Sequence, residues 1–142
     1  MRKTALAFGL VAAAALWPSA QAAVVTYKAT LAGASEVPPV QSAGKGAASV
    51  NVDTATKGVT WQVEYSGLSG PAAAAHIHCG APAGGNAGVA VPLGTAPNWN
   101  SPLKGNATLT DAQLQQLQSG QCYVNIHTEA HKGGEIRGQL AP

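Results

Sequence analysis

Hydrophobic and polar residues alternate along most of the chain after residue 22, with a period of two residues. In 24–31, VVTYKATL, the apolar side chains fall on one face and Thr26, Lys28 and Thr30 on the other. The stretches GAASVNVD (46–53) and VTWQVEY (59–65) alternate in the same way and are separated by the turn sequence TATKG. Such alternation predicts half-buried strands, because successive side chains of a strand point to opposite faces. The second and third strands are expected to form a hairpin.

Further strands are expected along the rest of the chain. They are predicted at about 73–79, 89–93 (VAVPL), 104–109 (KGNATL), 121–128 (QCYVNIHT) and 134–140 (GEIRGQL). One helix is expected after Thr110, because Thr110 and Gln113 have the spacing of a capping box and Gly120 marks the end. About eight strands, Gly/Pro-rich turns and one short helix predict an all-β sandwich or barrel.

The first 22 residues differ from the rest and have the pattern of an export signal. Arg2 and Lys3 precede an apolar run that is too short to span a bilayer, and Ala20-Gln21-Ala22 forms a small-x-small cleavage sequence. We therefore expect a signal peptide at 1–22, one domain at 23–142, and a secreted or periplasmic protein. No second apolar stretch is long enough for a transmembrane helix.

The balance of charged residues is different when the leader is excluded. The leader holds two of the eight Lys and Arg residues, so the rest of the chain has as many basic as acidic residues. No basic patch remains that would indicate binding to nucleic acid. The expected partners are therefore a metal ion or an extracytoplasmic protein.

The chain has two cysteines, Cys79 and Cys122, and an even pair in a small exported domain favours a disulfide. Alternation places Cys79 on the apolar face of its strand with Ile77, and Cys122 on the apolar face of its strand with Val124 and Ile126. Both thiols are thus expected to point into the core.

The same alternation places His76 and His78 on the polar face of one strand and His127 on the polar face of another. If the two strands are neighbours in one sheet, the three imidazoles lie together, and imidazole nitrogen is a suitable ligand for Cu(II) or Zn(II). His131, in the following loop, is a candidate fourth ligand. The alternative is that these histidines are exposed or hydrogen-bonded strand residues. Glu135 and Arg137 share the polar face of the last strand and are expected to form a weak surface salt bridge, with anion steering by Arg137 as the alternative.

Five segments in this order, SEVPPV, YSGLSGP, AAHIHCG, YVNIHT and GGEIRGQL, resemble the CHRD domain, the module first described in chordin. The resemblance covers about residues 24–140. It implies an extracytoplasmic Greek-key β-sandwich of immunoglobulin-like or superoxide-dismutase-like type, found in bacteria often alone behind a signal peptide. Chordin antagonises bone morphogenetic proteins, a role that does not transfer to an isolated domain. Positions that match the family motifs are His76, His78, His127, Glu135, Arg137 and Gly138, and the resemblance assigns no chemistry to them.

Three functions are consistent with these patterns. The first is a binding protein that holds copper or zinc through the histidines, and the second is a structural or adhesive interaction module without metal. The third and weakest is a copper-only enzyme of superoxide dismutase type, suggested by His-x-His on a β-sandwich strand. No nucleophile with a paired histidine and carboxylate, and no phosphate-binding loop, supports another enzyme class.

Overall fold

A computed structural model describes residues 23–142, so the expected leader at 1–22 lies outside the described residues. The described chain forms eight antiparallel strands, one α-helix and one short 3-10 turn. In chain order these are β1 (Val24–Ala32), η1 (Gly33–Ser35), β2 (Lys45–Asp53), β3 (Gly58–Ser66), β4 (Ala72–Cys79), β5 (Val89–Pro92), β6 (Leu103–Thr108), α1 (Asp111–Gln118), β7 (Cys122–Thr128) and β8 (Ile136–Gln139). The all-β prediction, with about eight strands and one short helix, is confirmed.

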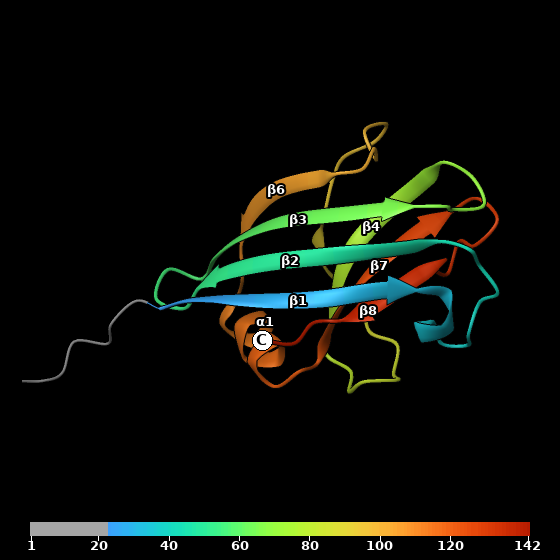
Figure 1. The fold of residues 1–142 in the computed structure, drawn as a ribbon. Helices are drawn as coiled ribbons and strands as arrows, with labels where there is room; N and C mark the ends of the chain where they lie inside the picture. The colour runs from blue at the N-terminus through green and yellow to red at the C-terminus, as the bar shows by residue number, and fades with distance from the viewer. Residues whose placement is uncertain (1–22) are drawn as a thin grey trace, which may run out of the picture.

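The strands form one continuous sheet in the order β5-β4-β7-β8-β1-β2-β3-β6. Figure 1 shows β1, β2, β3 and β6 in front of β4, β7 and β8, so the sheet folds back on itself and is nearly barrel-shaped. The two halves join where β1 meets β8, through the pair Ala32 and Arg137. Pairing of β4 with β7 and of β3 with β6 requires long connections, as in Greek-key folds.

The core lies between the two halves of the sheet. The apolar residues of the alternating patterns point inward, and Leu31, Val50, Val63, Val124, Ile126 and Ile136 are fully buried. The Trp61 indole N–H donates a hydrogen bond of 3.1 Å to the Leu93 carbonyl, which connects the two halves beside this core. Burial of these apolar surfaces supplies the main driving force for the fold.

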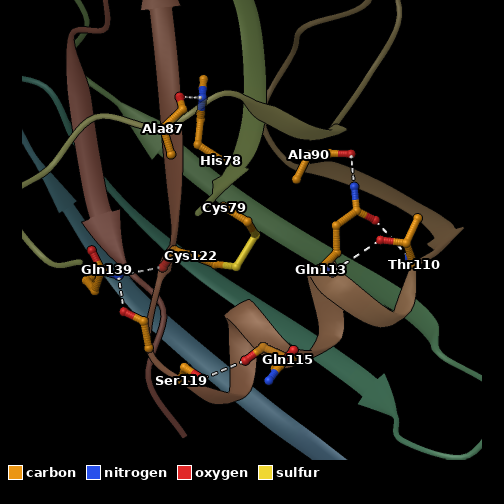
Figure 2. The surroundings of a disulfide bond; sticks show 11 residues. His78, Cys79, Ala87, Ala90, Thr110, Gln113, Gln115, Ser119, Cys122 and Gln139 are labelled. Carbon is orange, nitrogen blue, oxygen red and sulfur yellow. Dashed lines mark hydrogen bonds between the residues drawn. A yellow bond between two sulfur atoms is a disulfide. The ribbon is translucent and has the colours of Figure 1, made fainter. Parts of the chain in front are cut away.

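Helix α1 begins as the sequence predicts. The Gln113 backbone N–H donates to the Thr110 hydroxyl oxygen at 3.2 Å, and the Thr110 backbone N–H donates to the Gln113 side-chain oxygen at 2.9 Å. The Gln113 amide also donates to the Ala90 carbonyl in β5 (Figure 2). Gly120, with φ of 70°, follows the helix. Among residues 23–142, no helix is long and apolar enough to cross a membrane.

Cys79 and Cys122 form a disulfide between β4 and β7 (Figure 2). The two cysteines are register partners at the ends of the paired strands. The predicted disulfide is therefore confirmed, and the condition that the two strands are neighbours is met. The bond spans 43 residues of the sequence, including β5, β6 and α1.

Loss of the disulfide is expected to destabilise the fold strongly. The double variant Cys79→Ser, Cys122→Ser should lose about 4 kcal/mol of unfolding free energy, because a loop of 43 residues is no longer closed in the unfolded chain. Urea denaturation followed by circular dichroism measures this loss. Wild-type protein that has been reduced and alkylated should behave like the variant, and a loss below about 1 kcal/mol would contradict the expectation.

Candidate metal centre

Antiparallel pairing of β4 with β7 brings three histidines together on the face of these strands opposite the core, which we call the histidine face. His76 is the register partner of Asn125, and His78 is the register partner of Tyr123. The β4–β7 register shifts between Ala72 and Ala74, and beyond this shift His127 is the register partner of Ala74. One ring nitrogen from each of His76, His78 and His127 lies within 4.8 Å of the others.

Backbone carbonyls fix the rings of two of these histidines. Nδ1 of His78 lies 2.9 Å from the Ala87 carbonyl oxygen, and Nδ1 of His127 lies 3.0 Å from the Lys132 carbonyl oxygen. A carbonyl only accepts, so in each ring Nδ1 carries the proton and donates it. Each Nε2 is therefore unprotonated and carries its lone pair. A hydrogen bond of this kind, to the ring nitrogen that does not bind the metal, is the usual means of orienting a histidine ligand.

The two Nε2 atoms differ in their protein partners. Nδ1 of His76 lies 3.2 Å from Nε2 of His127. Because Nε2 of His127 is unprotonated, Nδ1 of His76 carries the proton and donates it to that nitrogen. Nε2 of His78 is buried, has no hydrogen-bond partner, and is one of two such side-chain atoms among the described residues. An unpaired buried acceptor costs free energy, and Nε2 of His78 is therefore available to a ligand beside the two other imidazoles.

The three imidazoles are neutral at neutral pH. Burial lowers the pKa of His76 to about 4, with the neighbouring His127 and His78 adding to the effect. Burial also lowers the pKa of His78 and of His127, although the hydrogen bonds to Ala87 and Lys132 act in the opposite direction. A metal ion binds the unprotonated form of histidine, so these shifts favour metal binding over protonation.

Two further side chains lie behind His78. The Tyr123 ring is stacked on the His78 ring with a centroid distance of 4.9 Å and an interplanar angle of 5°. The Arg137 guanidinium lies 3.4 Å from the centroid of the Tyr123 ring. Arg137, Tyr123 and His78 thus form a layered stack, which places a fixed positive charge one ring away from the histidine.

The expected surface salt bridge between Glu135 and Arg137 is wrong. Glu135 is 0% exposed and Arg137 is 2% exposed, and the two side chains bind different partners. Loops cover this end of β8, so alternation alone misassigns the polar face as a solvent face. Arg137 donates to the Gly85 carbonyl and to the Asn86 side-chain oxygen. It is therefore covered by the loop after β4 and does not face incoming anions.

Glu135 has its own set of hydrogen-bond donors. The Ser42 hydroxyl and the Ser69 backbone N–H donate to Oε1, and the Ser69 and Thr128 hydroxyls donate to Oε2, all at 2.6 to 2.7 Å. Burial alone would raise the pKa of Glu135, but these donors outweigh burial and lower it to about 2. The carboxylate thus joins the loops before β2 and β4 to the end of β7.

Sequence reasoning missed Glu36, which the structure places beside the histidine face. Glu36 is 5% exposed, and both of its oxygens accept from the Asn125 amide at 2.9 and 3.0 Å. Burial raises the pKa of Glu36 to about 7, although the Asn125 hydrogen bonds and the Arg137 charge act to lower it. No periodic pattern marks Glu36, because it follows η1 in a loop and meets a residue 89 positions away.

His131 stands outside the group of three histidines. It lies in the turn after β7, where its backbone N–H donates to the Thr128 carbonyl at 3.1 Å. The structure therefore brings together His76, His78 and His127 and does not add His131 to them.

Acid titration should reveal the Glu135 contribution to stability. The folded-state pKa of about 2 lies below the ordinary value of 4.5, so the stabilisation is complete above pH 4.5 and is lost as the pH falls toward 2. Glu135→Gln should lose about 1 to 3 kcal/mol at neutral pH and show a flatter decline below pH 4.5. Urea denaturation from neutral to acidic pH measures both effects. Glu129→Gln, at an exposed pair with Lys132, is the control and should behave like wild type.

Glu36 should have the opposite effect on the pH dependence of stability. Its folded-state pKa of about 7 exceeds the ordinary 4.5, so the ionised form destabilises the fold increasingly between pH 4.5 and 7. Glu36→Gln removes this penalty and adds a donor next to the Asn125 side-chain oxygen, which has no partner. The variant should be more stable than wild type above pH 7, by at most about 3 kcal/mol, and similar to it near pH 4.5. A loss of stability at both pH values would contradict the assignment.

The chain matches the model of one protein family. The chain has no significant match among curated proteins or among solved structures. The family model of the CHRD domain matches residues 27–140, which span β1 to the end of β8 and include the three histidines, the disulfide and the buried carboxylates. The resemblance seen in the sequence motifs is confirmed, and this chain belongs to the CHRD domain family.

Proposed function

We propose that this CHRD domain is an exported protein that binds one Cu(II) or Zn(II) ion through His76, His78 and His127. The observation that carries the proposal is the convergence of three imidazole nitrogens within 4.8 Å, two of them in rings that carbonyl hydrogen bonds hold in one tautomer. Nε2 of His78 is buried and has no hydrogen-bond partner. Burying this nitrogen costs free energy unless a ligand binds it, which supports a metal-binding role over a purely structural one.

The chemistry of the ligand set supports these two metals. All three donors are imidazole nitrogens, which suit zinc and copper, whereas magnesium and calcium require oxygen ligands. Both cysteines are in the disulfide, and they lie on the opposite side of the strands from the histidines. Three protein ligands leave a further coordination position for water or another small ligand.

Export is supported independently of the histidines. The family is of extracellular type, and a disulfide between β4 and β7 requires an oxidising compartment to form and persist. The leader-like residues 1–22 agree with this location. Metal binding in that compartment would serve storage, sensing or tolerance.

Isothermal titration of the oxidised protein with Cu(II) and with Zn(II) tests the proposal. Wild type should bind one ion per chain, and His78→Ala and His127→Ala should each lose at least about tenfold in affinity, because a ligand is removed. His131→Ala is the matched control and should bind like wild type, because His131 lies outside the cluster. Circular dichroism verifies that each variant is folded.

Two results would overturn the proposal. One is the absence of saturable binding to folded wild-type protein by either metal. The other is binding that survives both His78→Ala and His127→Ala. Either result would leave the chain as an interaction module, to be pursued through its extracytoplasmic protein partner.

A further inference from the structure

The loop between β4 and β5, residues 80–88 with the sequence GAPAGGNAG, is held against the histidine face by its last residues. The Ala87 carbonyl accepts from Nδ1 of His78 at 2.9 Å (Figure 2). The Ala87 backbone N–H donates to the Tyr123 hydroxyl at 3.1 Å. The Asn86 side-chain oxygen accepts from Arg137 at 3.0 Å. Backbone hydrogen bonds from Cys79 to Gly88 and from Gly80 to Gln121 fix the two ends of the loop. The contacts of Asn86 and Ala87 add to these and hold its later residues against the histidine face.

Arg137 supplies the strongest of these contacts. Its guanidinium is buried, yet neither salt bridge among residues 23–142 includes it. Instead it donates to the Asn86 side-chain oxygen and to the Gly85 carbonyl. A buried cation needs strong hydrogen bonds to offset the loss of water, so the loop and Arg137 stabilise each other.

Asn86 connects the loop to a second covering segment. Its amide donates to the Val37 carbonyl at 3.0 Å while its oxygen accepts from Arg137. Asn86 itself is exposed, so it contributes to the loop position through these hydrogen bonds and not through burial in the core. The adjacent residue, Ala87, carries the carbonyl that binds His78.

His78 is thus restrained on two sides by the same group of residues. Ala87 fixes Nδ1, and the Tyr123 ring, which lies under Arg137, stacks on the imidazole plane. Only Nε2 remains available for a ligand. His127 differs, because its Nδ1 binds the Lys132 carbonyl in the turn after β7.

We infer that Asn86 and Arg137 are positioning residues for the metal site: through the loop 80–88 they hold the Ala87 carbonyl on Nδ1 of His78 and thereby direct Nε2 of His78 toward the ion. This inference rests on the proposed function. In this role Arg137 orients a metal ligand through the loop; it neither forms a surface salt bridge nor steers anions. The inference also makes Asn86, a residue outside every strand and helix, a determinant of metal affinity.

The test measures the tautomer of His78 without metal. Long-range ¹H–¹⁵N correlation NMR, recorded above the ordinary imidazole pKa of about 6.5, distinguishes Nδ1–H from Nε2–H imidazoles. In wild type, His78 and His127 should both be Nδ1–H. In Asn86→Ala, His78 should become a mixture of tautomers, while His127 should stay Nδ1–H because its carbonyl partner lies in another loop.

Two further variants separate positioning from general stability. Asn86→Asp keeps an oxygen acceptor for Arg137 and should restore the Nδ1–H tautomer of His78. Asn106→Ala changes an exposed asparagine of β6, in the other half of the sheet, and should leave both histidines unchanged. Arg137→Lys keeps the charge but not the planar fork of donors, so it should resemble Asn86→Ala.

Metal titration of the same variants completes the test. Asn86→Ala should lose about 10- to 100-fold in Cu(II) and Zn(II) affinity, as expected when a group that orients a metal ligand is removed, and Asn86→Asp should recover most of it. An unchanged His78 tautomer in Asn86→Ala, or an affinity loss without a tautomer change, would overturn the inference. A failure of the proposed function is distinguishable from a failure of this inference. In the first case the wild-type protein itself binds neither metal, whereas the NMR measurement still tests whether Asn86 sets the His78 tautomer.

Discussion

Pairing of β4 with β7 is the constraint on which the rest of the site depends. The strands run antiparallel with Cys79 opposite Cys122, and this register also places His78 opposite Tyr123 and His76 opposite Asn125. A slip of one residue would exchange the two faces, sending the histidines into the core and the apolar residues outward. The disulfide opposes such a slip with a covalent bond at one end of the pair, and the buried Ile77, Val124 and Ile126 oppose it along its length.

The polar side chains around β7 and β8 are enclosed by loops, and their energetics differ from those of an exposed strand face. Glu135 meets four donors and is stable as an anion, whereas Glu36 shares only the Asn125 amide and has a raised pKa. Arg137 is buried without a carboxylate hydrogen-bond partner and relies on loop 80–88 and the Tyr123 ring. Because buried polar groups are stable only when paired, the loops have one favourable arrangement. That arrangement also sets the chemistry of His78.

Local patterns were sufficient to predict the strands, the helix cap and the three-histidine group. Alternation in 24–31 and 59–65 identifies faces correctly. The grouping of the histidines was conditional on two strands being neighbours, and the structure meets that condition. The covering of the histidine face could not be predicted in the same way. Glu36, Asn86 and Ala87 lie in loops without periodicity, and their partners are far away in sequence. The prediction of an exposed Glu135–Arg137 salt bridge was wrong because loops cover these residues. A strand pattern distinguishes the two faces of a strand but does not show which face meets water.

The central claim is that one metal ion is held by His76, His78 and His127. Anomalous diffraction at the zinc absorption edge, from crystals of the oxidised protein grown with Zn(II), tests it most directly. The account predicts one strong peak at about 2.0 to 2.1 Å from a nitrogen of each of the three rings, with Nε2 as the ligand atom of His78. A strong peak elsewhere on the chain, with no peak among these histidines, would contradict it.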